Sequence, residues 1–162
     1  MRKEFLAPFG IGMAALALLV AGIVWRQWGA HIELKGSILK VRSQPLDENS
    51  TAVVVDFRFR NPADYPFVVR KVEVRLEDGS GGMAEGMVIA ESDAQRLFEY
   101  FPVLGQKYNP TLLMRDRVQP KESADRMVAV RFELPQALVE ARRKLVVRVE
   151  EVDGAVSELV QE

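Results

Sequence analysis

The stretch VVVDFRFRNPADYPFVV, Val53 to Val69, has the most regular pattern in the chain. Apolar residues occupy every second position as far as Phe59, and polar residues, among them Asp56, Arg58 and Arg60, occupy most of the positions between them. Such alternation is typical of a β-strand with one buried and one wet face. An Asn-Pro pair then makes a turn, because asparagine can bond to its own backbone and proline fixes φ. The stretch therefore predicts two strands and the turn that joins them, and not a catalytic site.

The rest of the chain repeats the strand pattern, with turn residues between the segments. We expect about seven strands, at residues 32–42, 50–60, 67–77, 83–90, 111–120, 125–134 and 145–154. The connections are too short for parallel crossovers, so the strands are expected to pair antiparallel and to form a β-sandwich. The first and the final strand are expected at its edges.

Local signals add detail to this mainly β fold. Gly36 predicts a bulge in the first strand, and residues 44–50 read as a loop. A helix is expected from Ser92 to Phe101, because its apolar residues fall on one helical face and Ser92 with Gln95 makes a capping-box pattern. A second short helix is expected within residues 135–144, which begin with a proline.

The N-terminal segment predicts a membrane anchor. The run Phe5–Trp25 contains no charged residue and is long enough to cross about 30 Å of hydrocarbon as a helix. A cleavable signal peptide is the alternative, but its apolar core is shorter. The short basic tail before the run favours a domain outside the cytoplasm, periplasmic or extracellular. We expect an uncleaved single-pass anchor at residues 1–29 and the sandwich at residues 30–162.

Composition excludes several kinds of site. The chain has a formal net charge of −1, so it lacks the basic surface that nucleic-acid binding needs. It has no cysteine and one histidine, His31 at the predicted membrane interface, which rules out thiolate metal sites and a serine-histidine triad within the domain. The glycine-rich residues 77–82 lack the lysine and the following helix of a phosphate-binding loop. We therefore expect no catalytic residue, no metal and no cofactor.

The opening stretch also resembles a known domain. Residues 50–76, with an alternating strand, Asn61-Pro62 and a second apolar strand, are similar to the water-stress/hypersensitive-response (WHy) domain of type 2 late-embryogenesis-abundant proteins. Residues 117–135 resemble the strand pattern near the end of such domains. The resemblance implies an immunoglobulin-like or fibronectin-like sandwich without catalytic residues, and it implies no ligand.

Three residues are candidates for contact with a partner. Tyr100 falls off the apolar face of the expected helix, and exposed aromatic residues are enriched at interfaces. Arg58 and Arg60 make a basic spot on the wet strand face, where a cross-strand ion pair with Asp56 or a solvated surface is the competing interpretation.

Three functions remain open at this point. The first is a non-enzymatic membrane-anchored sandwich outside the cytoplasm that binds or stabilises an envelope protein. The alternative is a domain that carries an apolar ligand or lipid between its sheets, motivated by the many valine and phenylalanine residues and by the nearby bilayer. A small hydrolase that uses paired carboxylates is the third, and only a structure with clustered carboxylates could support it.

Overall fold

The computed structural model describes residues 12–22 and 33–162. Contacts divide the chain into two units, residues 1–31 and residues 32–162, and each is described by itself. In the first unit, residues 12–22 are helical. No helix among the described residues combines the length and the apolar character needed to cross a membrane. The remainder of the predicted anchor Phe5–Trp25 lies outside the described residues, as does His31, so the anchor stays a prediction.

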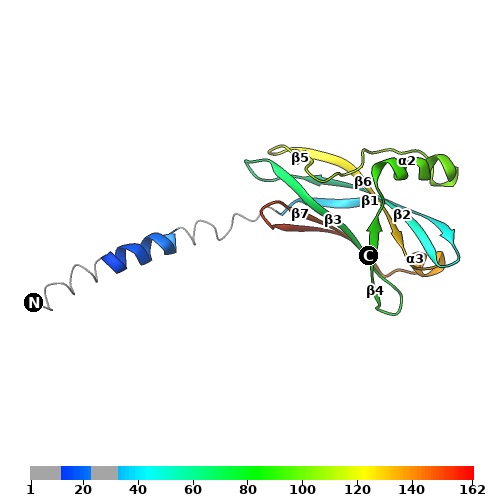
Figure 1. Cartoon of the computed structure of the whole chain (residues 1–162), viewed down its shortest axis with the longest axis horizontal. Coiled ribbons are helices and arrows are strands. Elements are labelled where there is room, and N and C mark those ends of the chain that lie inside the picture. Colours follow the sequence, from blue (N-terminus) through cyan, green and yellow to red (C-terminus); the bar gives the residue numbers. More distant parts are fainter. Residues whose placement is uncertain (1–11, 23–32) are drawn as a thin grey trace, which may run out of the picture. The chain divides into compact units, whose positions relative to one another are not determined.

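The second unit is mainly β, as the sequence predicts. Its elements are, in chain order, β1 (Lys35–Asp47), β2 (Ser50–Arg60), β3 (Phe67–Glu77), β4 (Met83–Val88), α2 (Glu91–Tyr100), η1 (Pro102–Leu104), β5 (Arg117–Val118), β6 (Ser123–Phe132), α3 (Gln136–Glu140), β7 (Lys144–Glu151) and β8 (Val156–Gln161) (Figure 1). β2 and β3 coincide with the predicted strands, and the turn between them holds the Asn-Pro pair.

Seven of the strands form one antiparallel path in the order β1-β2-β6-β4-β3-β7-β8, and β5 pairs with β3 beside it. β4 joins the two halves of the path, because it pairs with β3 over residues 83–86 and with β6 over residues 87–88. The half with β1, β2 and β6 and the half with β3, β7 and β8 then face one another across the main core. β1 and β8 are the ends of the path, so the expected edge position is correct for the first strand. It is wrong for the strand expected at residues 145–154, which forms β7 and pairs with both β3 and β8.

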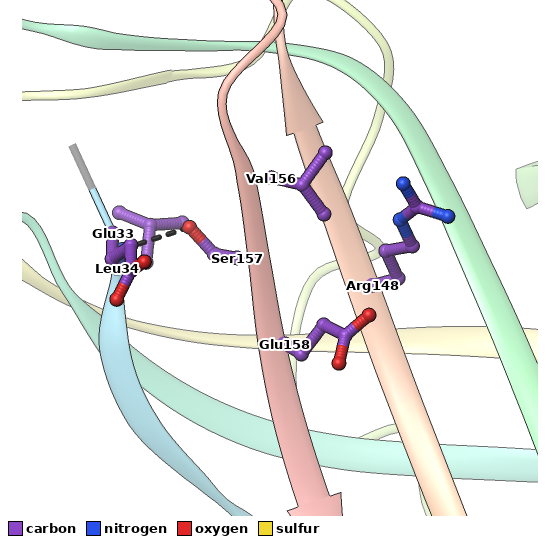
Figure 2. A pocket seen from close by; sticks show the side chains of 6 residues that line it. All are labelled: Glu33, Leu34, Arg148, Val156, Ser157 and Glu158. Atoms are coloured by element: carbon purple, nitrogen blue, oxygen red, sulfur yellow. Dashed lines mark hydrogen bonds between the residues drawn. The ribbon is translucent and has the colours of Figure 1, made fainter. Parts of the chain in front are cut away.

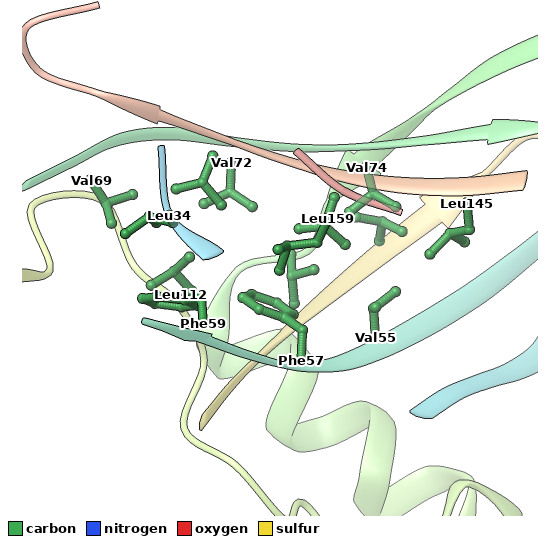
Figure 3. Close-up of a cluster of buried hydrophobic side chains, with 14 of the residues drawn as sticks. Leu34, Val55, Phe57, Phe59, Val69, Val72, Val74, Leu112, Leu145 and Leu159 are labelled. Atoms are coloured by element: carbon green, nitrogen blue, oxygen red, sulfur yellow. The ribbon is translucent and has the colours of Figure 1, made fainter. Parts of the chain in front are cut away.

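The core between the two halves is built from alternate residues of the facing strands. Every second residue of β2 from Val53 to Phe59 is fully buried there, as the alternation predicts. Figure 3 shows Val55, Phe57 and Phe59 directed toward Val74 of β3 and toward residues of β7 and β8. At about 25 cal/mol per Å² of apolar surface removed from water, this burial is the main stabilising contribution to the fold.

A second, smaller core covers the outer face of β2 and β6. Ala94 and Leu97 of α2 and Leu104 of η1 pack there against small side chains of the two strands, including Val54. The predicted wet face of β2 is therefore wrong for Val54 and Asp56, which are both buried. The reason is a third layer: α2 and the segment after it lie over this half of the sheet, which alternation within one strand cannot reveal.

Several local expectations are also corrected. β1 runs on to Asp47, through most of the predicted loop, because it continues to pair with β2. The register of β1 shifts between Ile38 and Lys40 and again between Pro45 and Asp47, and not at Gly36. Gly36 instead permits close approach of the two strands, since a Cβ there would lie 2.1 Å from the Arg58 carbonyl oxygen.

The remaining corrections concern helix α2 and the C-terminus. The N-cap of α2 is Ala90, without a side-chain cap, so the capping box at Ser92 is wrong. The segment expected as a short strand at residues 111–120 contains only the two residues of β5. β8 follows the strand that we expected to be the last, and the sequence pattern did not predict it. It pairs with β7 along its whole length, which makes β7 an interior strand.

Candidate interaction surface on the helix-covered face

A buried ion pair lies at the centre of the face that α2 covers. Arg42 of β1 donates from Nη2 to Asp56 Oδ2 of β2 at 2.6 Å, and the two residues are 8% and 3% exposed. Asn109 donates to the other carboxylate oxygen of Asp56 at 2.8 Å. The predicted cross-strand ion pair therefore exists, but its cation comes from β1 and the pair is buried, so neither Arg58 nor Arg60 takes part.

The same guanidinium holds the segment after α2 against the sheet. Arg42 Nη1 donates to the carbonyl oxygens of Leu104 at 2.6 Å and Gln106 at 2.8 Å. Its Cζ lies 5.1 Å from the ring centroid of Phe98 and 5.2 Å from that of Tyr108, which are cation-π distances. One side chain thus bonds strand β2, η1 and the loop of residues 105–110 and contacts helix α2, which holds the loop against the sheet.

Exposed aromatic and aliphatic side chains project from this fixed segment. Tyr100 at the end of α2 is 78% exposed, Val103 of η1 is 79% exposed and Tyr108 is 60% exposed. The Lys40 ammonium lies 5.3 Å from the Tyr108 ring centroid, and Lys40 makes no ion pair among residues 12–22 and 33–162. We call the three exposed residues Tyr100, Val103 and Tyr108 the aromatic surface. The sequence singled out Tyr100 alone, because the positions of Val103 and Tyr108 depend on Arg42, which no local pattern marks.

Arg58 and Arg60, the other two candidate residues, lie further along the outer face of β2. Arg58 is held by Asp125 of β6 through two bonds, Nε to Oδ1 at 2.6 Å and Nη2 to Oδ2 at 2.7 Å. These bonds raise the pKa of Arg58 and lower the pKa of Asp125. Arg60 is exposed. No hydrogen bond, ion pair or ring contact among the described residues joins Tyr100 to either arginine, so the structure does not gather the three into one site.

The outer face of the other half of the sheet is an open ladder of charges. Glu73 of β3 accepts a bond from Lys71, and it pairs with Arg75 at 3.1 Å and with Arg148 of β7 at 3.7 Å. The bond from Lys71 is the largest cause that lowers the pKa of Glu73. The ladder is charge-rich and uncovered, so it is a solvated strand face rather than a second aromatic surface.

A hollow of about 470 Å³ opens between the start of β1 and the start of β8. It is lined by Glu33, Leu34, Arg148, Val156, Ser157 and Glu158, and the Leu34 amide donates to Ser157 Oγ at 2.8 Å (Figure 2). Three of the lining side chains are charged, so the hollow does not suit an apolar ligand. The space between the sheets is itself filled by large side chains such as Phe57 and Phe132. Both observations count against the lipid-carrier alternative.

Catalysis and metal binding have no positive support. Within the described part of the chain, no group of three or more carboxylate or histidine side chains could hold a metal ion. Asp78, in the glycine-rich turn, uses Oδ1 to accept from Ser80 and from the Gly82 amide, as a turn-forming aspartate does. These contacts, that from the Ser80 side chain above all, lower its pKa. The absence of an enzymatic, metal or cofactor site stays a prediction.

Comparisons with known proteins show no family. No family model matches the chain, and no curated protein matches its sequence. The structure is similar to a chain of the archaellum periplasmic stator complex of FlaF and FlaG from Sulfolobus acidocaldarius, with 10% identity, a TM-score of 0.36, and 82% of this chain and 89% of that chain covered.

Two further solved structures are similar at the same level. The archaellum periplasmic stator protein FlaG from Sulfolobus acidocaldarius has 11% identity and a TM-score of 0.32, with 79% of this chain and 99% of that chain covered. An uncharacterised β-sandwich protein from Clostridium difficile 630 has 11% identity and a TM-score of 0.37, with 81% of each chain covered. Structural similarity at these TM-scores supports no inference about function. None of the three structures tests the resemblance to the WHy domain.

Proposed function

We propose that the chain is a single-pass membrane protein that presents a non-enzymatic, immunoglobulin-like β-sandwich outside the cytoplasm, where its aromatic surface binds a protein partner. The observation that carries the proposal is the aromatic surface itself: Tyr100, Val103 and Tyr108 are all more than half exposed on a segment that Arg42 holds in place. A fixed loop loses little conformational freedom on binding, so exposed aromatic groups on it make an efficient contact surface.

The anchor part of the proposal rests on the uncharged run Phe5–Trp25 and on the helix within it, at residues 12–22. The location outside the cytoplasm rests on the short basic tail that precedes the run. The lipid-carrier alternative is less favoured, because the core is filled and the hollow beside β8 is lined by charged groups. The resemblance to the WHy domain supports the same reading of the fold and stays a prediction.

The location is tested by labelling a single cysteine in intact cells. The chain has no native cysteine, so Ser80→Cys in the exposed turn after β3 provides one reactive thiol. We expect a membrane-impermeant maleimide to modify it without lysis. Modification only after lysis would place the sandwich in the cytoplasm and overturn that part of the proposal.

The binding surface is tested by photo-crosslinking in the same cells. A photoreactive amino acid replaces Val103 in one variant and Met83, an equally apolar residue that is 62% exposed on β4, in the control. We expect a discrete adduct from position 103 that is lost when Tyr100→Ala and Tyr108→Ala are added. Equal adducts from positions 103 and 83, or none from either, would contradict the assignment of the aromatic surface.

A further inference from the structure

The end of the sandwich at which β1 begins carries an exposed turn that is both apolar and basic. Met114 in this turn is 72% exposed and Leu113 is 41% exposed. Arg115 and Arg117, on either side of Asp116, are exposed as well. We call residues 113–117 the 113–117 turn. Exposed large apolar groups next to cations are the combination that settles at a membrane surface, where apolar groups enter the interface and cations meet lipid phosphates.

The register places this turn at the same end as the N-terminus of the domain. β5, which ends the turn, pairs with Phe67 and Val68 at the start of β3. β2 ends at Arg60 just before β3 begins, and Arg60 pairs with Lys35 at the start of β1. The 113–117 turn and the start of β1 therefore lie at one end of the sandwich, and Met83, paired with the last residue of β3, lies at the opposite end.

Backbone bonds hold the turn in a single shape. The Arg115 amide donates to the Val69 carbonyl at 2.7 Å, and the Val69 amide donates to the Asp116 carbonyl at 2.9 Å. Arg115 has a φ of 69°, in the left-handed region that non-glycine residues rarely adopt. The carboxylate of Asp116 accepts from the Leu113 amide at 3.0 Å. The one acidic residue of the turn is thus bonded within it, while Met114 and the two arginines remain exposed.

The exposed cations at this end lack partners of their own. Arg115, Arg117, Lys35 and Arg60 form no ion pair with any residue in the ranges that the structure describes. Lys35 and Arg60 are moreover directly opposite one another on β1 and β2, an arrangement of like charges that is unfavourable without a counter-charge. An anionic lipid surface would supply that counter-charge.

Several carboxylates at the same end are engaged elsewhere, whereas Glu33 and Asp153 are exposed and form no ion pair among the described residues. Asp64 pairs with Lys121 at 3.0 Å, and Asp125 is held by Arg58. Glu122 accepts from the Gln119 amide at 2.7 Å. The engaged side chains are therefore not available to neutralise the arginines of the 113–117 turn without giving up a contact that they already make.

The length of chain before β1 limits how far this end can be from a membrane. If the anchor ends at Trp25, the residues between it and Lys35 reach at most about 30 Å when fully extended. The sandwich itself is of comparable length, since β3 has 11 residues and a strand of that size extends about 35 Å. A chain of this length allows the end with β1 and the 113–117 turn to reach the lipid headgroups.

We propose that the 113–117 turn contacts the anionic bilayer surface next to the anchor, with Met114 in the interfacial region and Arg115 and Arg117 against lipid phosphates. This proposal rests on the membrane anchor proposed above. It gives the sandwich a defined orientation on the membrane, with the turn toward the lipid and Met83 away from it.

The test uses the full chain in lipid nanodiscs and one environment-sensitive fluorophore at a time. The label is attached at Met114→Cys, at the matched control Met83→Cys, or at Ala17→Cys within the helix of residues 12–22. The nanodiscs contain zwitterionic lipid alone or zwitterionic lipid with phosphatidylglycerol, together with a lipid that carries a quenching nitroxide at its headgroup or on its acyl chain. The quenching of each label is then measured.

We expect the acyl-chain nitroxide to quench the Ala17 label in both kinds of nanodisc. The headgroup nitroxide should quench the Met114 label at least about twofold more than the Met83 label when anionic lipid is present. Adding Arg115→Glu and Arg117→Glu should remove that excess, because each cation at an anionic surface contributes about fivefold to the partition. Such loss in anionic nanodiscs, with no change at Ala17, would support the turn as the contact.

Three outcomes would contradict the inference in distinguishable ways. If the Ala17 label is quenched but the Met114 and Met83 labels behave alike, the anchor stands and the 113–117 turn is not a membrane contact. If the Ala17 label is not quenched, the anchor itself is wrong and the inference falls with it. Equal quenching of the Met114 label with and without anionic lipid would remove the role of the two arginines.

Discussion

On the outer face of β2 the carboxylate of Asp56 is buried beneath α2 and its following loop, whereas on the outer face of β3 the carboxylate of Glu73 lies in an uncovered ladder of cations. Both are acidic residues at alternate positions of a central strand, and each meets an arginine of a neighbouring strand. The difference is the third layer. Where a loop covers the sheet, a buried charge needs partners because burial is costly. Arg42 finds them for its two Nη atoms, in Asp56 and in the carbonyl oxygens of Leu104 and Gln106, and so holds the loop against the sheet, although its Nε has no partner among the described residues. Where water covers the sheet, the same kind of pair contributes little.

The largest expected effect is at Asp56. Replacing it with alanine leaves the buried Arg42 guanidinium without its charge partner and frees Asn109, and breaking a buried pair in this way costs about 3–5 kcal/mol. The free energy of unfolding of the full chain, from urea denaturation, measures the change. Asp125→Ala, which removes an exposed ion pair on the same sheet, is the matched control, expected to cost less than about 1 kcal/mol. Similar losses in both variants would show that the loop does not exclude water from Asp56.

A smaller effect of opposite sign is expected at Glu151, at the end of β7. This side chain is 3% exposed, makes no ion pair among the described residues, and burial raises its pKa above the ordinary value of 4.5. A hydrogen bond from the Val68 backbone amide opposes this rise in pKa, and the negative charge of the nearby Asp153 adds to it. The charged form is therefore unfavourable in the fold, and Glu151→Gln, which keeps an acceptor for Val68, should stabilise the protein at neutral pH by about 1 kcal/mol.

The pH dependence of stability is a second test of whether Glu151→Gln stabilises the protein. A carboxyl group whose pKa is raised by folding contributes stability that is complete below pH 4.5 and is lost as the pH rises through the raised folded-state pKa. The thermal midpoints of the two proteins should therefore coincide in acid and separate as the pH increases, with the glutamine variant the more stable. A difference that shrinks toward neutral pH would contradict the burial of a charge at this position.

The smallest effect is expected at Glu73. Glu73→Gln removes the acceptor shared by Lys71, Arg75 and Arg148, but because those cations are partly or largely exposed we expect a loss of less than about 1 kcal/mol. Salt should reduce the loss further, since ions screen exposed charges. Denaturation at low and high salt measures both points. A large, salt-independent loss would mean that the two faces do not differ in the way described above.

The alternation of apolar residues and the turn residues were sufficient to predict β2 and β3, which face the main core. β2 and β3 begin and end as predicted, because their apolar residues toward the main core alternate along each strand and the Asn61 turn lies between them. Asn61 is fully buried and donates to the carbonyl oxygens of Tyr65 and Val118. β8 was not predicted, because its short alternation is recognisable only when paired with β7.

The sequence by itself determined that this protein has a mainly β, antiparallel domain with its core on one face of β2, since alternation and turn residues act over a few neighbouring positions. Tertiary structure alone decided which polar groups are buried. Arg42 and Asp56 come from different strands, and Asn109 and Tyr108 come from a loop more than fifty residues away in the chain. Whether a charge meets water or a partner depends on what packs over it, and no local pattern contains that information.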